Sequence, residues 1–211
     1  MNRRIKNKKE KYECREQIKK YPWLLEKTHW YTGKKIPKKE LRYDSTWFDA
    51  MYNGWRKAFE DNLCADLDNA LRKCNCRDNF MLLQVKEKYG ALRIYHSSAP
   101  EDVERVIDIY SHISEHTCIS CGKFGIPLTD AGWIVPICEQ CFRKHYKNSS
   151  KGYEEFIAEK EYDPIIHIRY SKRNKNGGYD DGMIEIDTMP YVRRMKKKYT
   201  SDYLKEIGDE V

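Results

Sequence analysis

The sequence predicts an α+β fold in which small antiparallel β-hairpins pack with helices and with a four-cysteine zinc module of treble-clef or zinc-ribbon type. Apolar residues recur at helical spacing in two segments, apolar and polar residues alternate around two glycine turns, and two C-x-x-C pairs occur in mid-chain. The 211 residues suffice for one compact domain with appendages or for two small ones. We expect four parts: a basic N-terminal arm at 1–20, an α+β core at 21–116, a zinc module at 117–147, and a C-terminal β-hairpin with a basic helix at 153–211.

Positive charge is concentrated in the N-terminal segment. Residues 1–42 contain 15 Lys or Arg against five Asp or Glu, whereas residues 43–142 contain 10 against 15. A basic arm is typical of proteins with an anionic partner, and it equally serves solubility. Residues 1–20 are predicted to be either helical or disordered, and the apolar cluster at 21–25 is the first segment that can dock on a core.

A long amphipathic helix is predicted from Asn53 to Lys73. Apolar residues recur at every fourth position, which predicts one buried face, and Asn53 is a suitable N-cap. A second amphipathic helix is predicted at 100–116, where Ser98 and Glu101 have the spacing of a capping box. The buried stripe of the first helix comprises Trp55, Phe59, Leu63, Leu67 and Leu71.

Between these helices, residues 81–96 predict a β-hairpin that turns at Tyr89-Gly90. A two-residue turn places Lys86 directly opposite Arg93, and like charges in that position destabilise a sheet. Such a pair persists where the face is solvated, where a carboxylate neutralises it, or where an anionic ligand binds. Alternation assigns Leu83, Val85, Leu92 and Ile94 to the core face.

The polar face of this hairpin provides candidate ligand-binding residues. An aromatic ring beside cations suits the recognition of a phosphate and a base. The candidates are Lys86, Lys88, Arg93 and Tyr95.

Four cysteines predict a Zn²⁺ site: Cys118, Cys121, Cys138 and Cys141. Two residues within each pair allow a tight turn that directs both thiolates at one ion, and the longer stretch between the pairs can form a hairpin that brings them together. Gly122 suits a turn with positive φ. Because four thiolates leave no open coordination position, the site is predicted to be structural. The C-x-C pair Cys74 and Cys76 offers only two ligands for a second metal.

The C-terminal region predicts a second hairpin at 165–187 and a final helix beginning near Pro190. That helix would carry the basic residues Arg193, Arg194 and Lys197, which we include among the candidate ligand-binding residues. A basic helix would bind nucleic acid in a salt-dependent, sequence-independent way, or it would simply be a solvated face.

The composition also narrows the class of protein. No apolar run reaches the roughly 18 residues that a membrane span needs, and the N-terminus lacks a signal peptide, so we expect a cytoplasmic protein with no membrane partner. Reduced cysteines fit that compartment. No Ser-His-Asp spacing, phosphate-binding glycine loop or paired-carboxylate motif stands out, which favours binding over catalysis.

Several segments together resemble a family of short zinc-ribbon proteins encoded by phages and prophages. The likeness covers about residues 21–142, and its strongest part is QVKEKYGALRIY at 84–95. The chain has Gly90-Ala91 where the family pattern has two glycines. The resemblance implies a phage context, a host cytoplasm and a zinc site, but no established activity. Its other parts are YPWLL at 21–25, WYTGK at 30–34, NGWRKAF at 53–59, LCADL at 63–67, HTCISCGK at 116–123, and Gly132-Trp133 leading to CEQC at 138–141.

We therefore expect a non-catalytic, zinc-stabilised accessory protein that binds an anionic partner, and nucleic acid is the leading candidate. One alternative is a counter-defence protein that sequesters a nucleotide immune messenger with Lys86, Arg93 and Tyr95. Another is an inhibitor that docks on a host enzyme and uses the zinc module as a rigid platform.

Overall fold

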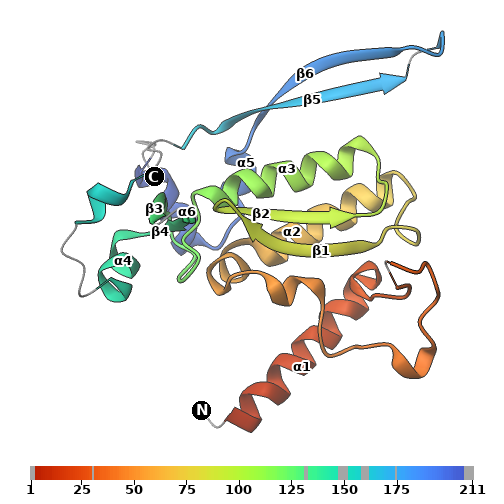
Figure 1. Ribbon diagram of the computed structural model, residues 1–211, viewed down its shortest axis with the longest axis horizontal. Helices are drawn as coiled ribbons and strands as arrows, with labels where there is room; N and C mark the ends of the chain where they lie inside the picture. Colours follow the sequence, from red (N-terminus) through yellow and green to blue (C-terminus); the bar gives the residue numbers. More distant parts are fainter. Residues whose placement is uncertain are drawn as a thin grey trace.

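The computed structural model describes residues 3–29, 31–130, 133–146, 152–157, 162–173 and 175–206. It confirms a mixed α+β fold with helices and three separate two-stranded antiparallel hairpins (Figure 1). The α-helices are α1 (Arg3–Lys20), α2 (Asn53–Lys73), α3 (Glu101–Glu115), α4 (Glu139–His145), α5 (Met189–Arg193) and α6 (Lys197–Glu206). The strand pairs are β1 (Leu82–Lys88) with β2 (Ala91–His96), β3 (Ile126–Asp130) with β4 (Trp133–Ile137), and β5 (Ile165–Arg173) with β6 (Tyr179–Asp187). Short 3₁₀ helices are η1 (Pro22–Leu24), η2 (Lys38–Glu40), η3 (Trp47–Ala50) and η4 (Tyr153–Phe156).

Helix α2 lies at the centre of the molecule and has the predicted bounds. Its apolar stripe is buried, with Trp55, Leu63 and Leu71 all 0% exposed. The predicted cap is wrong: Tyr52 is the N-cap residue, it makes no side-chain cap bond, and Asn53 is already helical. The N–H of Gly54 is satisfied instead by a distant backbone carbonyl, that of Ile119, at 2.8 Å.

The β1–β2 hairpin turns where predicted. Tyr89 and Gly90 have φ of 54° and 80°, as a two-residue turn of the type favoured in hairpins requires, and Lys86 pairs with Arg93. One prediction for its core face is wrong. Leu82 is buried in place of Leu83, because the register shifts between Leu82 and Gln84 and changes which side chain faces inward.

Helix α3 packs against α2 and also alongside β2. The Leu92 N–H donates to the Ser114 hydroxyl at 2.7 Å, so the helix satisfies part of a strand edge that would otherwise be unpaired. The capping box predicted for α3 is not formed. Pro100 is the N-cap residue, and the Glu101 carboxylate pairs with Arg105 one turn later.

The C-terminal segment joins the same core as α2 and α3. Val192, Met195, Tyr199 and Tyr203 are at most 4% exposed within that core. The single basic helix predicted near Pro190 is wrong: α5 ends at Arg193 and α6 begins at Lys197, so the basic run spans a break between two helices. The β5–β6 hairpin projects from the body (Figure 1), and the boundaries of the four expected parts stay predictions.

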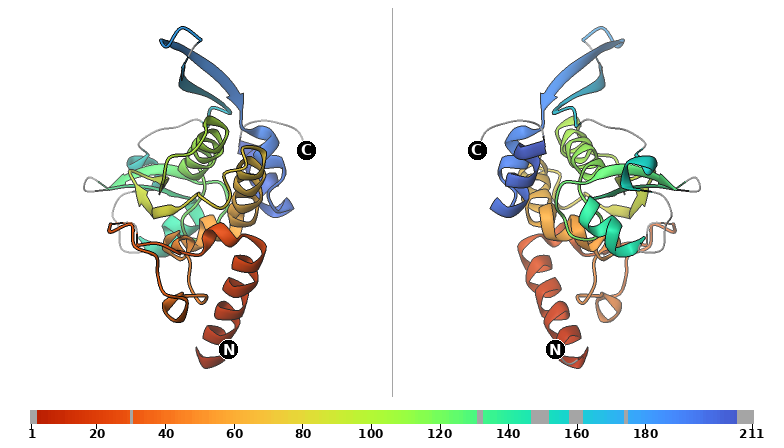
Figure 2. Two further views of the ribbon diagram at one scale, coloured as in Figure 1. Left: turned by 90° about the vertical axis from the view of Figure 1, so that its right-hand side faces the viewer. Right: turned by 90° about the vertical axis from the view of Figure 1, so that its left-hand side faces the viewer.

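Helix α1 docks through its C-terminal half, where Cys14 and Ile18 are buried in the main core. The rest of the helix extends away from the body (Figures 1 and 2). Trp23, which follows in η1, is 3% exposed and donates its indole N–H to Asp68 at 3.0 Å. Among the described residues, no helix is both long and apolar enough to cross a membrane.

Candidate metal centre

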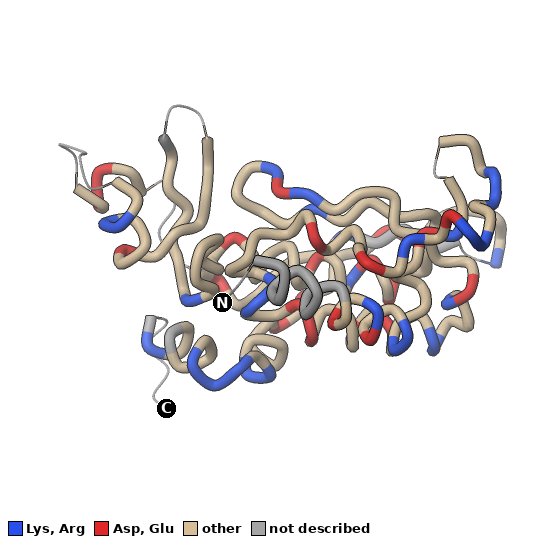
Figure 3. Tube along the Cα trace, turned by 90° about the horizontal axis from the view of Figure 1, so that it is seen from below, with Lys and Arg blue, Asp and Glu red and all other residues tan. Residues whose placement is uncertain are grey.

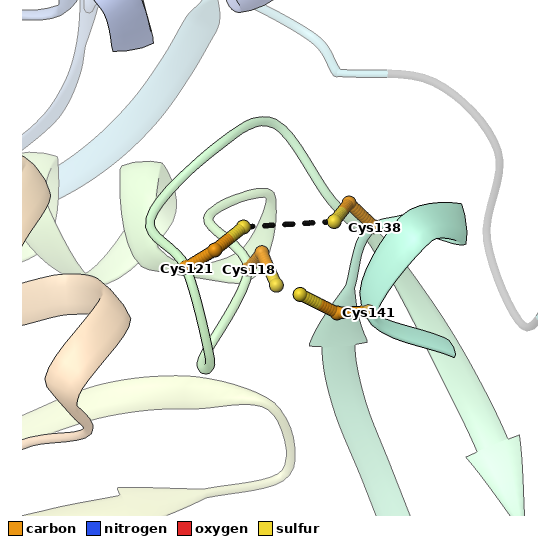
Figure 4. Close-up of side chains that lie close together, drawn as sticks. All are labelled: Cys118, Cys121, Cys138 and Cys141. Carbon is orange, nitrogen blue, oxygen red and sulfur yellow. Dashed lines mark hydrogen bonds between the residues drawn. The ribbon is translucent and has the colours of Figure 1, made fainter. Parts of the chain in front are cut away.

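The structure brings the four predicted cysteines together. Their sulfur atoms all lie within 4.8 Å of one another, and the side chains converge from two segments (Figure 4). Cys118 and Cys121 come from the loop after α3, which we call the knuckle (residues 118–122). Cys138 and Cys141 come from the first turn of α4.

This arrangement fits a tetrahedral thiolate site. Zn–S bonds of about 2.3 Å place the sulfurs of such a site about 3.8 Å apart. The Sγ atoms of Cys121 and Cys138 are separated by 3.6 Å, which is close to that spacing and far longer than a disulfide bond of about 2.05 Å. All eight cysteines are free thiols. The cluster can therefore hold a metal ion, and four soft sulfur donors suit zinc.

The thiols already share their protons unevenly. Hydrogen bonds from Cys121 and Cys138 lower the pKa of the buried Cys118 thiol far below its ordinary value. The same hydrogen bond to Cys118 raises the pKa of Cys138, which keeps the shared proton. Burial raises the pKa of Cys141 to about 12. A bound cation would displace the remaining protons, because each ligand must be a thiolate.

Local structure positions the two pairs as the spacing predicts. Gly122 closes the knuckle with φ of 87°, the left-handed conformation that glycine adopts without strain. Strands β3 and β4 run out and back between the pairs, and α4 starts immediately after Cys138. The order of knuckle, hairpin and helix is that expected for a treble-clef module. A small core of its own supports it, formed by Leu128, Ile137 and Phe142 with Tyr146, Tyr153 and Phe156 around them.

The knuckle is attached to α2 through the backbone. A Cβ atom placed on Gly54 would lie 1.9 Å from the Cys118 carbonyl oxygen, and one placed on Gly122 would lie 2.6 Å from the Gly54 carbonyl oxygen. Both positions therefore require glycine. The start of α2 and the metal knuckle are in direct contact although more than 60 residues separate them along the chain.

Buried hydrogen bonds hold the residue that precedes Cys118. The Trp55 indole N–H donates to the Thr117 carbonyl at 2.8 Å, and the Thr117 hydroxyl donates to the Ile113 carbonyl at 2.7 Å. The Tyr203 hydroxyl, from α6, contacts the Thr117 hydroxyl and donates to the same Ile113 carbonyl at 2.8 Å. Sequence reasoning missed Gly54, Thr117 and Tyr203. The only local signal was the glycine next to Trp55 in NGW.

The candidate ligand residues of the first hairpin lie on its polar face. The Lys86 ammonium sits 4.8 Å from the centre of the Tyr95 ring, and that of Lys88 sits 5.2 Å from the centre of the Tyr89 ring. The Arg93 guanidinium donates to the Ser111 hydroxyl at 2.6 Å, which turns it toward α3. Their role in ligand binding stays a prediction.

The C-terminal candidates are dispersed. Arg194 forms two hydrogen bonds to the nearly buried Asp66 carboxylate, at 2.7 and 2.6 Å, and the Tyr110 hydroxyl donates to the same carboxylate at 2.7 Å. Arg194 therefore joins α5 to α2. Arg193 and Lys197 are exposed on either side of the helix break.

Cys74 and Cys76 join no metal-binding group. Over the residues that the structure describes, the four-cysteine cluster is the one set of three or more His, Cys, Asp or Glu whose ligand atoms converge. Cys76 instead donates to the Cys74 carbonyl at 3.1 Å.

Comparisons of the chain with protein-family models, with curated proteins and with solved structures find no match.

Proposed function

We propose that this chain is a zinc-stabilised, non-catalytic protein that binds nucleic acid through its N-terminal basic region. The four cysteines would hold Zn²⁺. Because their thiolates fill a tetrahedral coordination sphere, the metal supplies folding energy and no open position for a reaction. The resemblance to phage and prophage zinc-ribbon proteins belongs to this proposal as well, and it supplies the context of a phage-infected cell.

One observation carries the proposal: the surface lysines that follow α1 are exposed and unneutralised. Within the described part of the chain, none of Lys34, Lys35, Lys38 and Lys39 has an ion-pair partner. We call these four the basic loop. Helix α1, which carries nine Lys or Arg against three Glu, lies on the same lower side of the molecule (Figure 1). Exposed cations that no carboxylate neutralises are available to bind a polyphosphate backbone.

Sequestration of a nucleotide has less support. A small ligand is usually enclosed in a concave site that removes most of its surface from water. Lys86, Arg93 and Tyr95 lie on one face of a two-stranded sheet, where Lys86 already covers the Tyr95 ring and Arg93 is bonded to Ser111. An open face of this kind suits a polymer that extends along it.

Fluorescence anisotropy with a labelled 20-base-pair DNA duplex tests the proposal. The affinity should fall steeply with salt. A variant with Lys34, Lys35, Lys38 and Lys39 all changed to Gln should reduce the slope of log K against log salt by about 3.6, since each phosphate contact contributes about 0.9. The matched control changes Lys73, Lys144, Lys175 and Lys205 to Gln, which are exposed and spread over other faces.

Equal losses in the two variants would show that net charge alone is responsible and would contradict a specific basic surface. Absence of binding to any nucleic acid at low salt would reject the proposed function. Capture of a host enzyme would then support the interaction-protein alternative.

A further inference from the structure

Three exposed aromatic side chains lie along the β1–β2 hairpin and at the adjoining start of β4: Tyr89 is in the turn, and Tyr95 pairs with Gln84 near the other end of the hairpin. Tyr89 is 68% exposed, Trp133 is 70% exposed and Tyr95 is 42% exposed. Single exposed aromatic residues are common, whereas several on adjoining elements mark an interaction surface. Two hairpins from different parts of the chain build this one: Tyr89 and Tyr95 belong to β1–β2, and Trp133 begins β4.

Direct contact between the two hairpins places the start of β4 beside the β1–β2 turn. A Cβ placed on Gly90 would lie 3.0 Å from the Ile134 Cγ2 atom, so the turn abuts β4 beside Trp133. Seen from below, the turn of the β1–β2 hairpin points toward the β3–β4 hairpin, which runs roughly at right angles to it (Figure 3). Tyr95 and Trp133 belong to paired strands, and Tyr89 lies in the tight two-residue turn between β1 and β2.

Cations accompany the rings. Lys86 and Lys88 place their ammonium groups 4.8 and 5.2 Å from the ring centres of Tyr95 and Tyr89. Glu87, the acidic residue between them, accepts a hydrogen bond from the Gly90 N–H at 2.7 Å and so belongs to the turn. A surface of exposed rings with adjacent ammonium groups can stack bases on the rings while the lysines contact phosphates.

We propose that Tyr89, Tyr95 and Trp133, together with Lys86 and Lys88, form a stacking platform for single-stranded nucleic acid. This inference rests on the proposed function and specifies its ligand. Bases in a duplex are stacked inside the helix and cannot meet an aromatic ring, whereas those of a single strand expose both faces. In the view of Figure 1 the basic loop lies below the right-hand end of the β1–β2 hairpin and the turn lies at its left-hand end, so a strand that contacts both must run along the hairpin.

The test compares binding of a fluorescein-labelled 20-nucleotide oligo-dT with binding of the 20-base-pair duplex. The double variant Tyr95→Ala with Trp133→Ala should lose about 100-fold in oligo-dT affinity, about tenfold for each stacked base. Its duplex affinity should stay within about twofold. The matched control is Tyr179→Ala, which removes a ring that is 66% exposed on the distant β5–β6 hairpin and should change neither affinity.

A second readout is the fluorescence of Trp133. The chain has five tryptophans, of which Trp23 and Trp55 are at most 3% exposed, so the part of the quenching by oligo-dT that the Trp133→Phe variant loses reports on the exposed indole of Trp133. The Trp133→Phe variant should keep most of the affinity and show clearly less quenching than the unmodified protein. All substituted side chains are exposed, and circular dichroism with zinc analysis verifies that each variant is folded.

Two results would overturn the platform and leave the proposed function intact: oligo-dT affinity that the double variant does not change, or equal losses for oligo-dT and duplex. If the unmodified protein bound neither probe, the platform and the proposed function would both fail.

Discussion

The knuckle and helix α1 both pack against α2, but they are attached in different ways. The knuckle meets α2 backbone to backbone, at a contact that leaves no room for a single methyl group on Gly54. Helix α1 is attached by side chains: Cys14 and Ile18 are buried, and the Gln17 amide donates to the Glu60 carboxylate at 2.8 Å. A polar cavity of about 730 Å³ lies between α1 and α2. The metal module is thus built into the core, whereas the described residues of α1 attach it through side-chain contacts, so we expect α1 to open more easily.

Among the changes that test this difference, removal of the metal should have the largest effect on stability. Chelation by EDTA, or the Cys138→Ser substitution, should cost up to roughly 10 kcal/mol, because the binding energy of a structural zinc is folding energy. Since the knuckle is part of the core, α2 and α3 should lose stability along with the zinc module. Thermal unfolding followed by far-UV circular dichroism measures this loss. A melting temperature that stays unchanged in EDTA would show that the module and the core fold independently.

The Gly54→Ala substitution should cost about 4 kcal/mol or prevent folding, since neither backbone can move away from a Cβ at 1.9 Å. Urea unfolding together with the zinc content of the purified protein measures the effect. The matched control is Gly152→Ala, where φ is −77° and the nearest atom to the added Cβ is 3.7 Å away. A small loss at Gly54, similar to that at Gly152, would contradict the backbone contact.

The Tyr203→Phe substitution tests the opposite side of the knuckle. Removing a buried hydroxyl that donates to the Ile113 carbonyl should cost about 1–2 kcal/mol. It should also accelerate zinc release to a chromogenic chelator, because Thr117 loses a contact. Tyr179→Phe, on the exposed end of β6, is the control and should change neither quantity. An unchanged rate of zinc release in Tyr203→Phe would show that α6 does not stabilise the metal site.

The attachment of α1 is tested by the reactivity of its cysteine. Burial, followed by the charges of Asp49 and Asp44, raises the pKa of Cys14 to about 11, so a docked Cys14 stays a protonated, unreactive thiol at pH 8. Opening of α1 should expose it, and Cys14 should be alkylated at least about tenfold faster than the fully buried Cys64 of α2. Mass spectrometry of each cysteine after timed alkylation provides the rates. Equal rates would mean that α1 and α2 unfold together.

The raised pKa of Cys14 also makes the stability of the docked α1 depend on pH. Because its folded pKa of about 11 exceeds the ordinary thiol value of 9.0, burial of Cys14 contributes fully to stability below about pH 9. That contribution decreases as the pH rises from 9 toward 11. The docking of α1 should therefore weaken in strongly alkaline buffer before the core does.

Residue spacing within single segments predicted the elements that are formed by residues close together in the sequence. The bounds of α2, the turn at Tyr89-Gly90, the register that opposes Lys86 to Arg93 and the convergence of four cysteines all follow from spacing. The errors have a common cause. The N–H of Gly54 found its acceptor on Ile119, and Arg194 found Asp66, so contacts between distant segments replaced a local cap and a solvated basic helix. No pattern within a single segment reports such contacts.

The contact between Tyr203 and Thr117 has a consequence for the growing chain. Tyr203 follows Thr117 by 86 residues, so a ribosome completes the knuckle long before it makes α6. Until then, the Trp55 indole can bind the Thr117 carbonyl, but the ring contact between Tyr203 and Phe124 is missing. The four-cysteine cluster can therefore assemble before the contact between Tyr203 and Thr117 forms.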